Sequence, residues 1–544
     1  MVFIANLRQR ILTMRFNVGA VRENLSIRVI SRYLGHDYSK NNGSSPVPLI
    51  CSLLLVLFLY VPWISSGYVN YEFPVEIAAR VLSRSGLDSE MKFYFDNQAN
   101  PLGYSIFLSF IYRIFGYHDW QWLTRVPSLF GACLSCIAGW VLFKKLVDPR
   151  GKGFLRWSLL VLCNPLFFVY STKATADVLP VGLVMMSFAL ASKASLKSWR
   201  LPALSGIFFG LSVITKYNMI FFAPALCVFC LQIETSGDLN LKRLLRSVPL
   251  IVFPAATIFI VYTWWVYARF GVFLIPDEYA LMMKPNFYDL GSWILTLGKY
   301  LAFLGILVGP SVLIQVEVAR IWRWRPVMFM TFIFLSGWFG VSGHRAGEMD
   351  FGSGTGVTEN SARILESMGL VLIIGFVLRL RDIYKKDSAL VLFVWLSLVP
   401  FLIFMSFSRP AQRYLLVLVP ILSFVVLKAL LTRRSIFRNV LFVAVVSSML
   451  LVSIGGSLFL RAQGNSSEKM SVWIRDNGLA GMTNPGVITP HAKHHFLRQA
   501  RSVDKYEVVI VDGRGNFSNE NEYIHVEKMS ILGFVVRNYV LRKI

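Results

Sequence analysis

The chain has 544 residues, of which 55% are hydrophobic and only 16% are charged. Soluble domains are typically about 45–50% apolar and about 25% charged, so this composition excludes an ordinary soluble protein and favours an integral membrane protein. The net charge of +25 would suit a nucleic-acid-binding protein. However, the basic residues are scattered between apolar runs and form no single basic face, so we expect no nucleic acid partner.

The first 47 residues form a basic segment with seven Lys or Arg residues and two acidic ones. The first apolar run begins only near Leu49, and no small-residue cleavage site follows it. This pattern predicts a cytoplasmic tail over 1–47 followed by a helix that stays in the protein, rather than a cleaved signal peptide.

Apolar runs of membrane-span type recur along the rest of the chain. A spanning helix needs about 20 predominantly apolar residues. Such runs occur at 49–64, 120–143, 157–172, 178–193, 201–215, 217–233, 247–268, 293–315, 326–342, 364–380, 388–407, 414–431 and 439–461. They predict an all-α polytopic membrane protein with about thirteen transmembrane helices over 48–462. Because some runs are short and two pairs nearly touch, a count two higher or lower also fits.

The connections between these runs alternate in charge. Loops rich in Lys and Arg begin near residues 144, 193, 242, 320, 379 and 433, and the intervening loops are mixed or acidic. Positively charged loops stay in the cytoplasm. The alternation therefore predicts a cytoplasmic N-terminus, an odd number of crossings and a C-terminus outside.

Two of the segments assigned to the outside are large. Within the first, 65–119, apolar residues recur at helical spacing over 72–84, and a second helical pattern follows Pro101 over 102–115. Both are expected to lie along the membrane surface as amphipathic helices. The second segment, 463–544, has strand-like runs separated by turn signals such as Asn484-Pro485-Gly486. It predicts a small α/β domain outside the membrane.

Ionisable residues at membrane depth or at helix mouths are costly and are therefore functional candidates. An enzyme that uses a polyprenyl-phosphate sugar needs a carboxylate to deprotonate the attacking hydroxyl and cations to hold the departing phosphate. The outside face supplies both types, although each residue alone fits equally well as a charge that sets topology. The candidates are Glu72, Glu76, Lys173, Asp177, Lys216, Arg409 and Arg413.

Several motifs resemble those of a known superfamily. They are Asn100–Tyr104, Ile111–Gly116 and Leu123–Ser128 in the first outside segment and the next span, Asn164–Asp177, Gly206–Tyr217 and Gln412–Leu415. In this order and on this side of the membrane they resemble GT-C glycosyltransferases. The branch they resemble contains the lipid A aminoarabinose transferases and the protein O-mannosyltransferases. The resemblance covers about 65–230 and, more thinly, 405–425.

The chain departs from the family pattern at two positions. The resemblance implies an acidic pair shortly before the first surface helix, but Asn70 stands at the usual aspartate position and cannot act as a base. A lysine of the family is replaced by Asn100. Glu72 is the nearest carboxylate, so we predict Glu72 and Asp177 as catalytic residues, with Glu72 as general base and Glu76 as the alternative.

The resemblance implies a transferase in the bacterial inner membrane that moves a sugar from a polyprenyl-phosphate donor to a lipid, glycan or protein acceptor at the outer face. Lys216, Arg413 and Arg409 are predicted to bind the lipid phosphate, with Lys173 as a further candidate. The chemistry is compatible with a divalent metal, and no nucleotide cofactor is expected, since no nucleotide-binding motif occurs. A lipid-linked sugar transporter and a non-catalytic homologue remain the alternatives.

Overall fold

We describe the fold from a computed structural model. The residues that it describes are 45–68, 72–84, 91, 100–116, 121–194, 199–231, 241–274, 290–313, 369–370, 372–373, 376–377, 388–407, 412–432, 436–484, 505–512, 523–531 and 534–543. All but the last three residues of the basic segment 1–47 lie outside them, as do the run predicted at 326–342, most of the run predicted at 364–380, Asn70 and Arg409.

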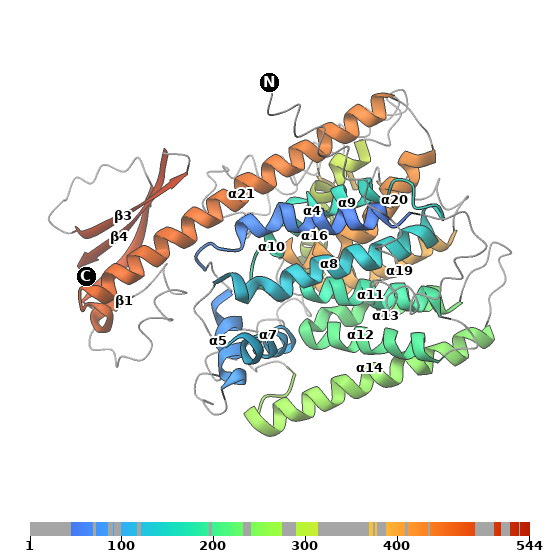
Figure 1. Cartoon of the computed structure of the whole chain (residues 1–544), viewed down its shortest axis with the longest axis horizontal. Coiled ribbons are helices and arrows are strands. Elements are labelled where there is room, and N and C mark those ends of the chain that lie inside the picture. The colour runs from blue at the N-terminus through green and yellow to red at the C-terminus, as the bar shows by residue number, and fades with distance from the viewer. Residues whose placement is uncertain are drawn as a thin grey trace, which may run out of the picture. The chain divides into compact units, whose positions relative to one another are not determined.

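Over the described residues the chain is mainly helical, and most of the predicted apolar runs are helices (Figure 1). The α-helices are α4 (Val47–Tyr60), α5 (Glu72–Ser83), α7 (Gly103–Phe115), α8 (Gln121–Leu146), α9 (Phe154–Leu162), α10 (Pro165–Ser171), α11 (Val178–Lys193), α12 (Arg200–Thr215), α13 (Ala223–Leu231), α14 (Leu241–Phe270), α16 (Leu290–Leu313), α19 (Ser388–Met405), α20 (Leu418–Thr432) and α21 (Ile436–Asp476). Short 3₁₀ helices are η1 (Val61–Trp63), η2 (Tyr217–Phe222), η3 (Gln412–Val417) and η4 (Ala480–Met482).

Helices α8, α11, α12 and α14 pack side by side in that order (Figure 1). Glycines allow these helices to approach closely. A Cβ added at Gly131 would lie 2.6 Å from the Leu179 Cα atom, and one at Gly206 of α12 would collide with the Ile251 carbonyl oxygen of α14. Small residues at contacts of this kind are typical of helix packing in membranes, where apolar burial from water contributes little.

The run predicted at 157–172 is a bent pair of helices, α9 and α10, with an angle of 72° between them. The break lies at Asn164-Pro165, where the Asn164 side chain accepts a hydrogen bond from the Leu166 N–H at 3.1 Å. Proline suits the first position of a helix because it has no N–H to satisfy there. This bend leads the chain into the turn 172–177, which carries two of the candidate residues.

The helical patterns predicted at 72–84 and 102–115 are present as α5 and α7, which pack against each other. Most of α5 is buried, and the position of the two helices along a membrane surface stays a prediction. Helix α7 keeps Phe110, Ile114 and Phe115 more than half exposed, while Tyr104 and Leu108 are buried. An amphipathic helix with an exposed apolar edge is suited to lie in the plane of the membrane interface.

Helix α21 continues without a break from the last predicted apolar run into the C-terminal segment, so the expected boundary at residue 463 lies inside a helix. Its C-terminal part packs on a four-stranded sheet of β1 (Thr483–Asn484), β2 (Tyr506–Asp512), β3 (Tyr523–Ile531) and β4 (Phe534–Lys543) (Figure 1). The strand order is β1-β2-β4-β3, with a parallel β1–β2 pair and two antiparallel pairs. Met470 and Ile474 of the helix share a buried core with Val508, Met529 and Tyr539.

Among the described residues, fewer helices meet the length and hydropathy criteria for a membrane span than the thirteen runs predicted from the sequence. Among the described helices three are long and apolar enough to cross a membrane, namely those containing 121–146, 245–270 and 438–476, and the bent pair α9–α10 makes a fourth if counted as one span. Helices such as α11, with 16 residues, are about 24 Å long, which is less than the roughly 30 Å hydrocarbon core. The structure establishes apolar membrane helices but not the count of thirteen.

The contact between Gly67 and Gly464 gives a test of this arrangement. A Cβ added at Gly67 would lie 2.5 Å from the Gly464 carbonyl carbon, and one at Gly464 would collide with the Gly67 carbonyl oxygen. We expect Gly464→Ala to lower the free energy of unfolding by about 1–3 kcal/mol, because backbone atoms must move apart. Thermal unfolding of the purified protein in detergent measures this change.

Gly455→Ala is the matched control, since it lies on the same helix and a Cβ there meets nothing within 4 Å. It should be neutral or stabilising by up to about 1 kcal/mol, because alanine is the better helix former. Equal behaviour of the two variants would contradict the close contact.

Candidate active site

The candidate site is formed at one end of α8, where four chain segments meet. These are the stretch 64–67 after η1, the first turn of α5, the first turns of α8 and the turn 172–177 between α10 and α11. Two groups of polar and charged side chains lie at or beside this end of α8. The first is the Arg125 cluster (Ser66, Glu72, Arg125 and Lys173). The second is the Tyr414 cluster (Asp177, Lys216, Arg413 and Tyr414), which also draws on the residue after α12 and on η3.

Arg125 is the centre of the first cluster and has no exposed surface. Its Nε and one terminal nitrogen donate to the two oxygens of Glu72, at 2.8 and 2.9 Å. The same guanidinium donates to the carbonyl oxygens of Ile64 and Ser66 at 2.8 Å each and to that of Gly67 at 3.1 Å. A buried charge is tolerated only when it is paired and hydrogen-bonded, and every nitrogen of this guanidinium has a partner.

Glu72 is equally buried and also accepts the Ala174 N–H at 2.6 Å. Burial by itself raises the pKa of this carboxyl, but the charges of Arg125 and Lys173 and the hydrogen bonds from Arg125 and Ala174 outweigh burial and lower the pKa below its usual value. The base role predicted for Glu72 requires an open carboxylate beside the acceptor. In the structure this carboxylate instead forms a closed ion pair with Arg125, a geometry that favours another residue as the base.

Lys173 lies on the turn next to this pair and is 4% exposed. Its Nζ donates to the Ser66 hydroxyl at 3.4 Å, and its carbonyl accepts the Ser128 hydroxyl at 2.6 Å. Burial, together with repulsion from Arg125, lowers the pKa of Lys173 to about 7, although Glu72 acts in the opposite direction. Lys173 thus lies in the Arg125 cluster and does not add a cation to the Tyr414 cluster.

The second cluster unites residues that are far apart in the sequence. The Lys216 ammonium donates to the Asp177 carboxylate, and both side chains are 5% exposed. The Lys216 Nζ also lies 4.8 Å from the centre of the Tyr414 ring, and the Arg413 guanidinium carbon lies 5.6 Å from the same centre. Two cations against one aromatic ring form favourable cation–π contacts. Lys216 and Arg413, about two hundred residues apart in the sequence, therefore lie against the same ring, and their binding of a phosphate stays a prediction.

Asp177 connects the two cations electrostatically. Burial raises its pKa, but the charges of Lys216 and then Arg413, with hydrogen bonds from Lys216 and Thr175, reverse this effect and lower the pKa. Asp177 is therefore an ionised carboxylate beside two cations, and it precedes the first residue of α11.

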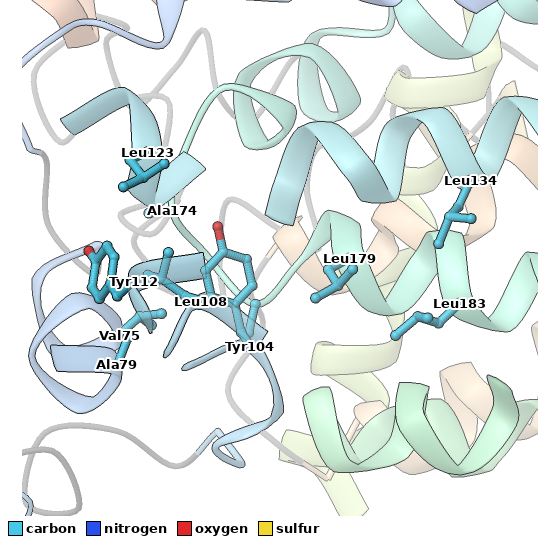
Figure 2. Close-up of a cluster of buried hydrophobic side chains, with 11 residues drawn as sticks. Val75, Ala79, Tyr104, Leu108, Tyr112, Leu123, Leu134, Ala174, Leu179 and Leu183 are labelled. Carbon is cyan, nitrogen blue, oxygen red and sulfur yellow. The ribbon is translucent and has the colours of Figure 1, made fainter. Parts of the chain in front are cut away.

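An apolar layer holds the turn 172–177 in place. Ala174 and Ala176 of the turn are buried with Val75 and Ala79 of α5, and with residues of α7, α8 and α11. Figure 2 shows Ala174 at the level of Leu123 and Tyr104, with Leu134, Leu179 and Leu183 continuing the layer along α8 and α11. The Tyr104 hydroxyl donates to the Thr124 carbonyl at 2.9 Å, which fixes α7 on α8.

The remaining predicted residues belong to neither cluster as defined above. Glu76 is 1% exposed on α5, and Asn100 is half-buried just before α7. Arg409 and Asn70 lie outside the described residues. Three residues of the clusters, Ser66, Arg125 and Tyr414, were not predicted as functional candidates from the sequence. Arg125 did carry a signal, because it is a charge inside a predicted apolar run.

A family model matches part of the chain. Residues 99–267 match the family model described as dolichyl-phosphate-mannose-protein mannosyltransferase. The matched segment contains Arg125, Lys173, Asp177 and Lys216. The resemblance to GT-C glycosyltransferases predicted from the motifs is confirmed over this segment. No curated protein matches the chain.

Two solved structures are similar in outline. One is ArnT from Cupriavidus metallidurans bound to undecaprenyl phosphate, with 12% identity, 91% of this chain and 97% of that chain covered, and a TM-score of 0.43. The other is the Archaeoglobus fulgidus oligosaccharyltransferase in complex with zinc and sulfate, with 12% identity, 79% and 55% covered, and a TM-score of 0.41. At these scores the likenesses do not bear on the chemistry of the site.

The described residues do not supply a metal site. No group of three or more His, Cys, Asp or Glu side chains is placed to hold an ion among them. Glu72 and Asp177, the two carboxylates expected to be catalytic, are each paired with a different cation instead of facing each other.

The Glu72–Arg125 pair can be tested by its energetic coupling. Removing one partner of a buried pair leaves an uncompensated charge and typically costs 3–5 kcal/mol. We expect Glu72→Gln and Arg125→Met each to lower the free energy of unfolding by about this amount, and the double variant to lose clearly less than the sum of the two. Denaturant unfolding in detergent provides the four values.

The exposed pair of Glu507 and Arg542 in the sheet, with an N–O distance of 2.6 Å, is the control. Because exposed pairs contribute about 0–1 kcal/mol, Glu507→Gln should have little effect. A Glu72→Gln variant as stable as the native protein would contradict the buried pair.

Proposed function

We propose that the protein is a glycosyltransferase that moves a sugar from a polyprenyl-phosphate donor to an acceptor at the outer face of a membrane. The observation that supports this most directly is the convergence of Lys216 and Arg413 on Tyr414 beside Asp177. The family-model match over 99–267 supports the same class of reaction.

Lys216 and Arg413 are the proposed ligands of the donor phosphate. An ammonium has three donors, so Lys216 can hold Asp177 and a phosphate oxygen at the same time. Arg413, which is half-buried, adds a planar guanidinium that can bind a phosphate through two hydrogen bonds. Together they stabilise the negative charge that develops on the phosphate as the bond to the sugar breaks. Arg409, four residues before Arg413, remains a predicted third ligand.

Asp177 replaces Glu72 as the proposed general base. The Glu72 carboxylate has three donors around it and no exposed surface. Asp177 lies next to the cations that would hold the phosphate. When the phosphate takes over part of Lys216, Asp177 loses part of its pairing and becomes a better proton acceptor. The proton of the acceptor hydroxyl passes to Asp177, the hydroxyl oxygen bonds to the sugar, and the lipid phosphate leaves.

The outer face is proposed from the charge distribution. The candidate site lies at the N-terminal end of α8, while Lys144 and Lys145 lie at its C-terminal end. The positive-inside rule assigns the lysine end to the cytoplasm, which leaves the site and the C-terminal sheet outside. Because this assignment and the bacterial inner membrane rest on sequence, they stay predictions, as do the sugar and the acceptor.

Donor binding is the first test. We expect Lys216→Gln and Arg413→Gln each to weaken binding of a fluorescent polyprenyl phosphate by roughly ten- to hundred-fold, because a hydrogen bond to a charged group contributes about 1.5–3 kcal/mol. Arg413→Lys should lose less than Arg413→Gln, since the charge remains.

Arg269→Gln is the charge-matched control. Arg269 is exposed near the end of α14, where Val266 and Tyr262 pack with Ile77 and Leu102 at the same end of the bundle. It should bind the probe as the native protein does. Native-like affinity of both Lys216→Gln and Arg413→Gln would refute the phosphate site.

The second test concerns the base. We expect Asp177→Asn to lower turnover by roughly 10²–10⁴-fold, the usual contribution of general-base catalysis. Its donor affinity should be unchanged or higher, because the variant removes an anion that competes with phosphate for Lys216. Release of lipid phosphate from a polyprenyl-phosphate sugar measures turnover.

Glu72→Gln distinguishes the two carboxylates in the same assay. If folded Glu72→Gln loses turnover while Asp177→Asn keeps it, the base is Glu72 and our assignment is wrong. If the native protein binds donors but consumes none, it is a non-catalytic homologue.

A further inference from the structure

A cavity lies at the opposite end of α8 from the candidate site. It has a volume of about 360 Å³ and is lined by Lys152, Gly153, Arg156, Leu430, Leu431, Arg438 and Asn439. Helix α20, which contributes Leu430 and Leu431 to the lining, is tied to this end of α8: the Lys428 Nζ donates to the carbonyl of Val147, just past the last residue of α8, at 3.1 Å. Helix α8 has 26 residues and is therefore about 39 Å long, somewhat more than the roughly 30 Å hydrocarbon core.

The lining combines cationic and aliphatic side chains. Three of its seven residues carry a positive charge, and no acidic side chain is among them. Arg438 is 8% exposed and Arg156 is half-buried, with its guanidinium carbon 5.8 Å from the centre of the Phe442 ring. The nearest acid in sequence, Asp148, accepts the backbone N–H groups of Arg150 and Lys152 at 3.2 and 2.8 Å. Three positive charges with no carboxylate among the seven lining residues make the cavity attractive to an anion.

The backbone also favours an anion here. Gly153, with φ of +95°, caps the N-terminus of α9, and Arg438 and Asn439 lie in the first turn of α21. Two helix N-termini therefore reach the cavity, and each carries partial positive charge from the helix dipole.

The surface beside the cavity points to a lipid as the source of that anion. Leu155 of α9 is 41% exposed, and Val440 and Val443 of α21 are 62% and 61% exposed. In a membrane helix such residues face acyl chains. A cation-lined cavity bordered by lipid-facing aliphatic side chains matches the two halves of an anionic phospholipid. Basic pockets between membrane helices on the cytoplasmic side are suited to lipid headgroups of this kind.

We propose that this cavity binds the phosphate headgroup of an anionic phospholipid, separately from the donor site. The phosphate contacts Lys152, Arg156 and Arg438, where arginine can bind it through two parallel hydrogen bonds. The acyl chains run along the exposed faces of α9 and α21. The lipid thereby joins α9 to the first turn of α21, the helix that also carries the C-terminal sheet.

Native mass spectrometry of the full-length protein can test this by titration with phosphatidylglycerol and, separately, phosphatidylcholine. We expect phosphatidylglycerol to bind more tightly, and Lys152→Gln/Arg156→Gln to weaken it by about 30-fold, since each Lys or Arg near an anionic lipid contributes roughly five-fold. Lys145→Gln/Arg150→Gln is the control, because it removes the same charge from exposed residues that do not line the cavity. It should retain native affinity.

If the double variant does not fold, the single Lys152→Gln change at an exposed residue should still weaken binding about five-fold. Equal losses in variant and control, or no loss in either, would overturn the proposal. Displacement of phosphatidylglycerol by inorganic phosphate at equal concentration would reassign the cavity to a soluble anion and likewise overturn it. Because the readout is lipid binding, the outcome does not depend on transferase activity.

Discussion

Arg125 lies with its guanidinium fully withdrawn from water, in a helix whose composition suits a membrane span. A charge in such a place must find a partner for each of its donors, since the alternative is a penalty of several kcal/mol. Three backbone carbonyls of 64–67 and one carboxylate fulfil this need. This need for partners explains the path of the segment 64–67. Its carbonyls can face Arg125 only if the segment wraps around the first turns of α8.

The same constraint reaches α21. Once the segment 64–67 is wrapped in this way, its Gly67 meets Gly464, and the Asn465 side chain accepts the Gly67 N–H at 2.9 Å. Gln121, in the first turn of α8, donates to Glu468 one helical turn further on, at 2.9 Å. The helix that carries the C-terminal sheet is therefore attached to the segment that surrounds Arg125. Any side chain at residue 464 would separate the two backbones, which explains glycine there in physical terms.

Periodicity and hydropathy predicted most of this fold, because a helix in an apolar environment depends on its own residues. The run 178–193 coincides with α11, and the two patterns in the first outside segment are α5 and α7. The bend at Asn164-Pro165 and the continuation of α21 to Asp476 were not predicted. An apolar run in the sequence ends where polar residues begin, whereas a helix ends where its backbone hydrogen bonds or its packing contacts end. Contacts with the sheet extend α21 beyond its apolar run.

The sequence singled out the cations of the candidate site but did not predict which carboxylate pairs with which cation. Lys216 and Arg413 could be singled out because a charge at a helix mouth is costly wherever it occurs. Which cation holds which carboxylate depends on the turn 172–177, whose Ala174 N–H points at Glu72 while Asp177, three residues later, meets Lys216. That turn is placed by apolar contacts of Ala174 and Ala176 with α5 and α7, which no local pattern encodes.

In the mechanism that we propose, the two carboxylates have different roles. Glu72 must stay ionised to keep Arg125 buried, so protonating it would weaken the framework around the site with each turnover. Asp177 is paired with a flexible lysine whose ammonium is able to exchange one anion for another. A residue that takes up a proton in each cycle has to be one whose pairing changes when the donor phosphate arrives. In the mechanism that we propose, Glu72 is therefore the framework anion and Asp177 the reactive one, and the turn 172–177 carries the residues that pair them with separate cations.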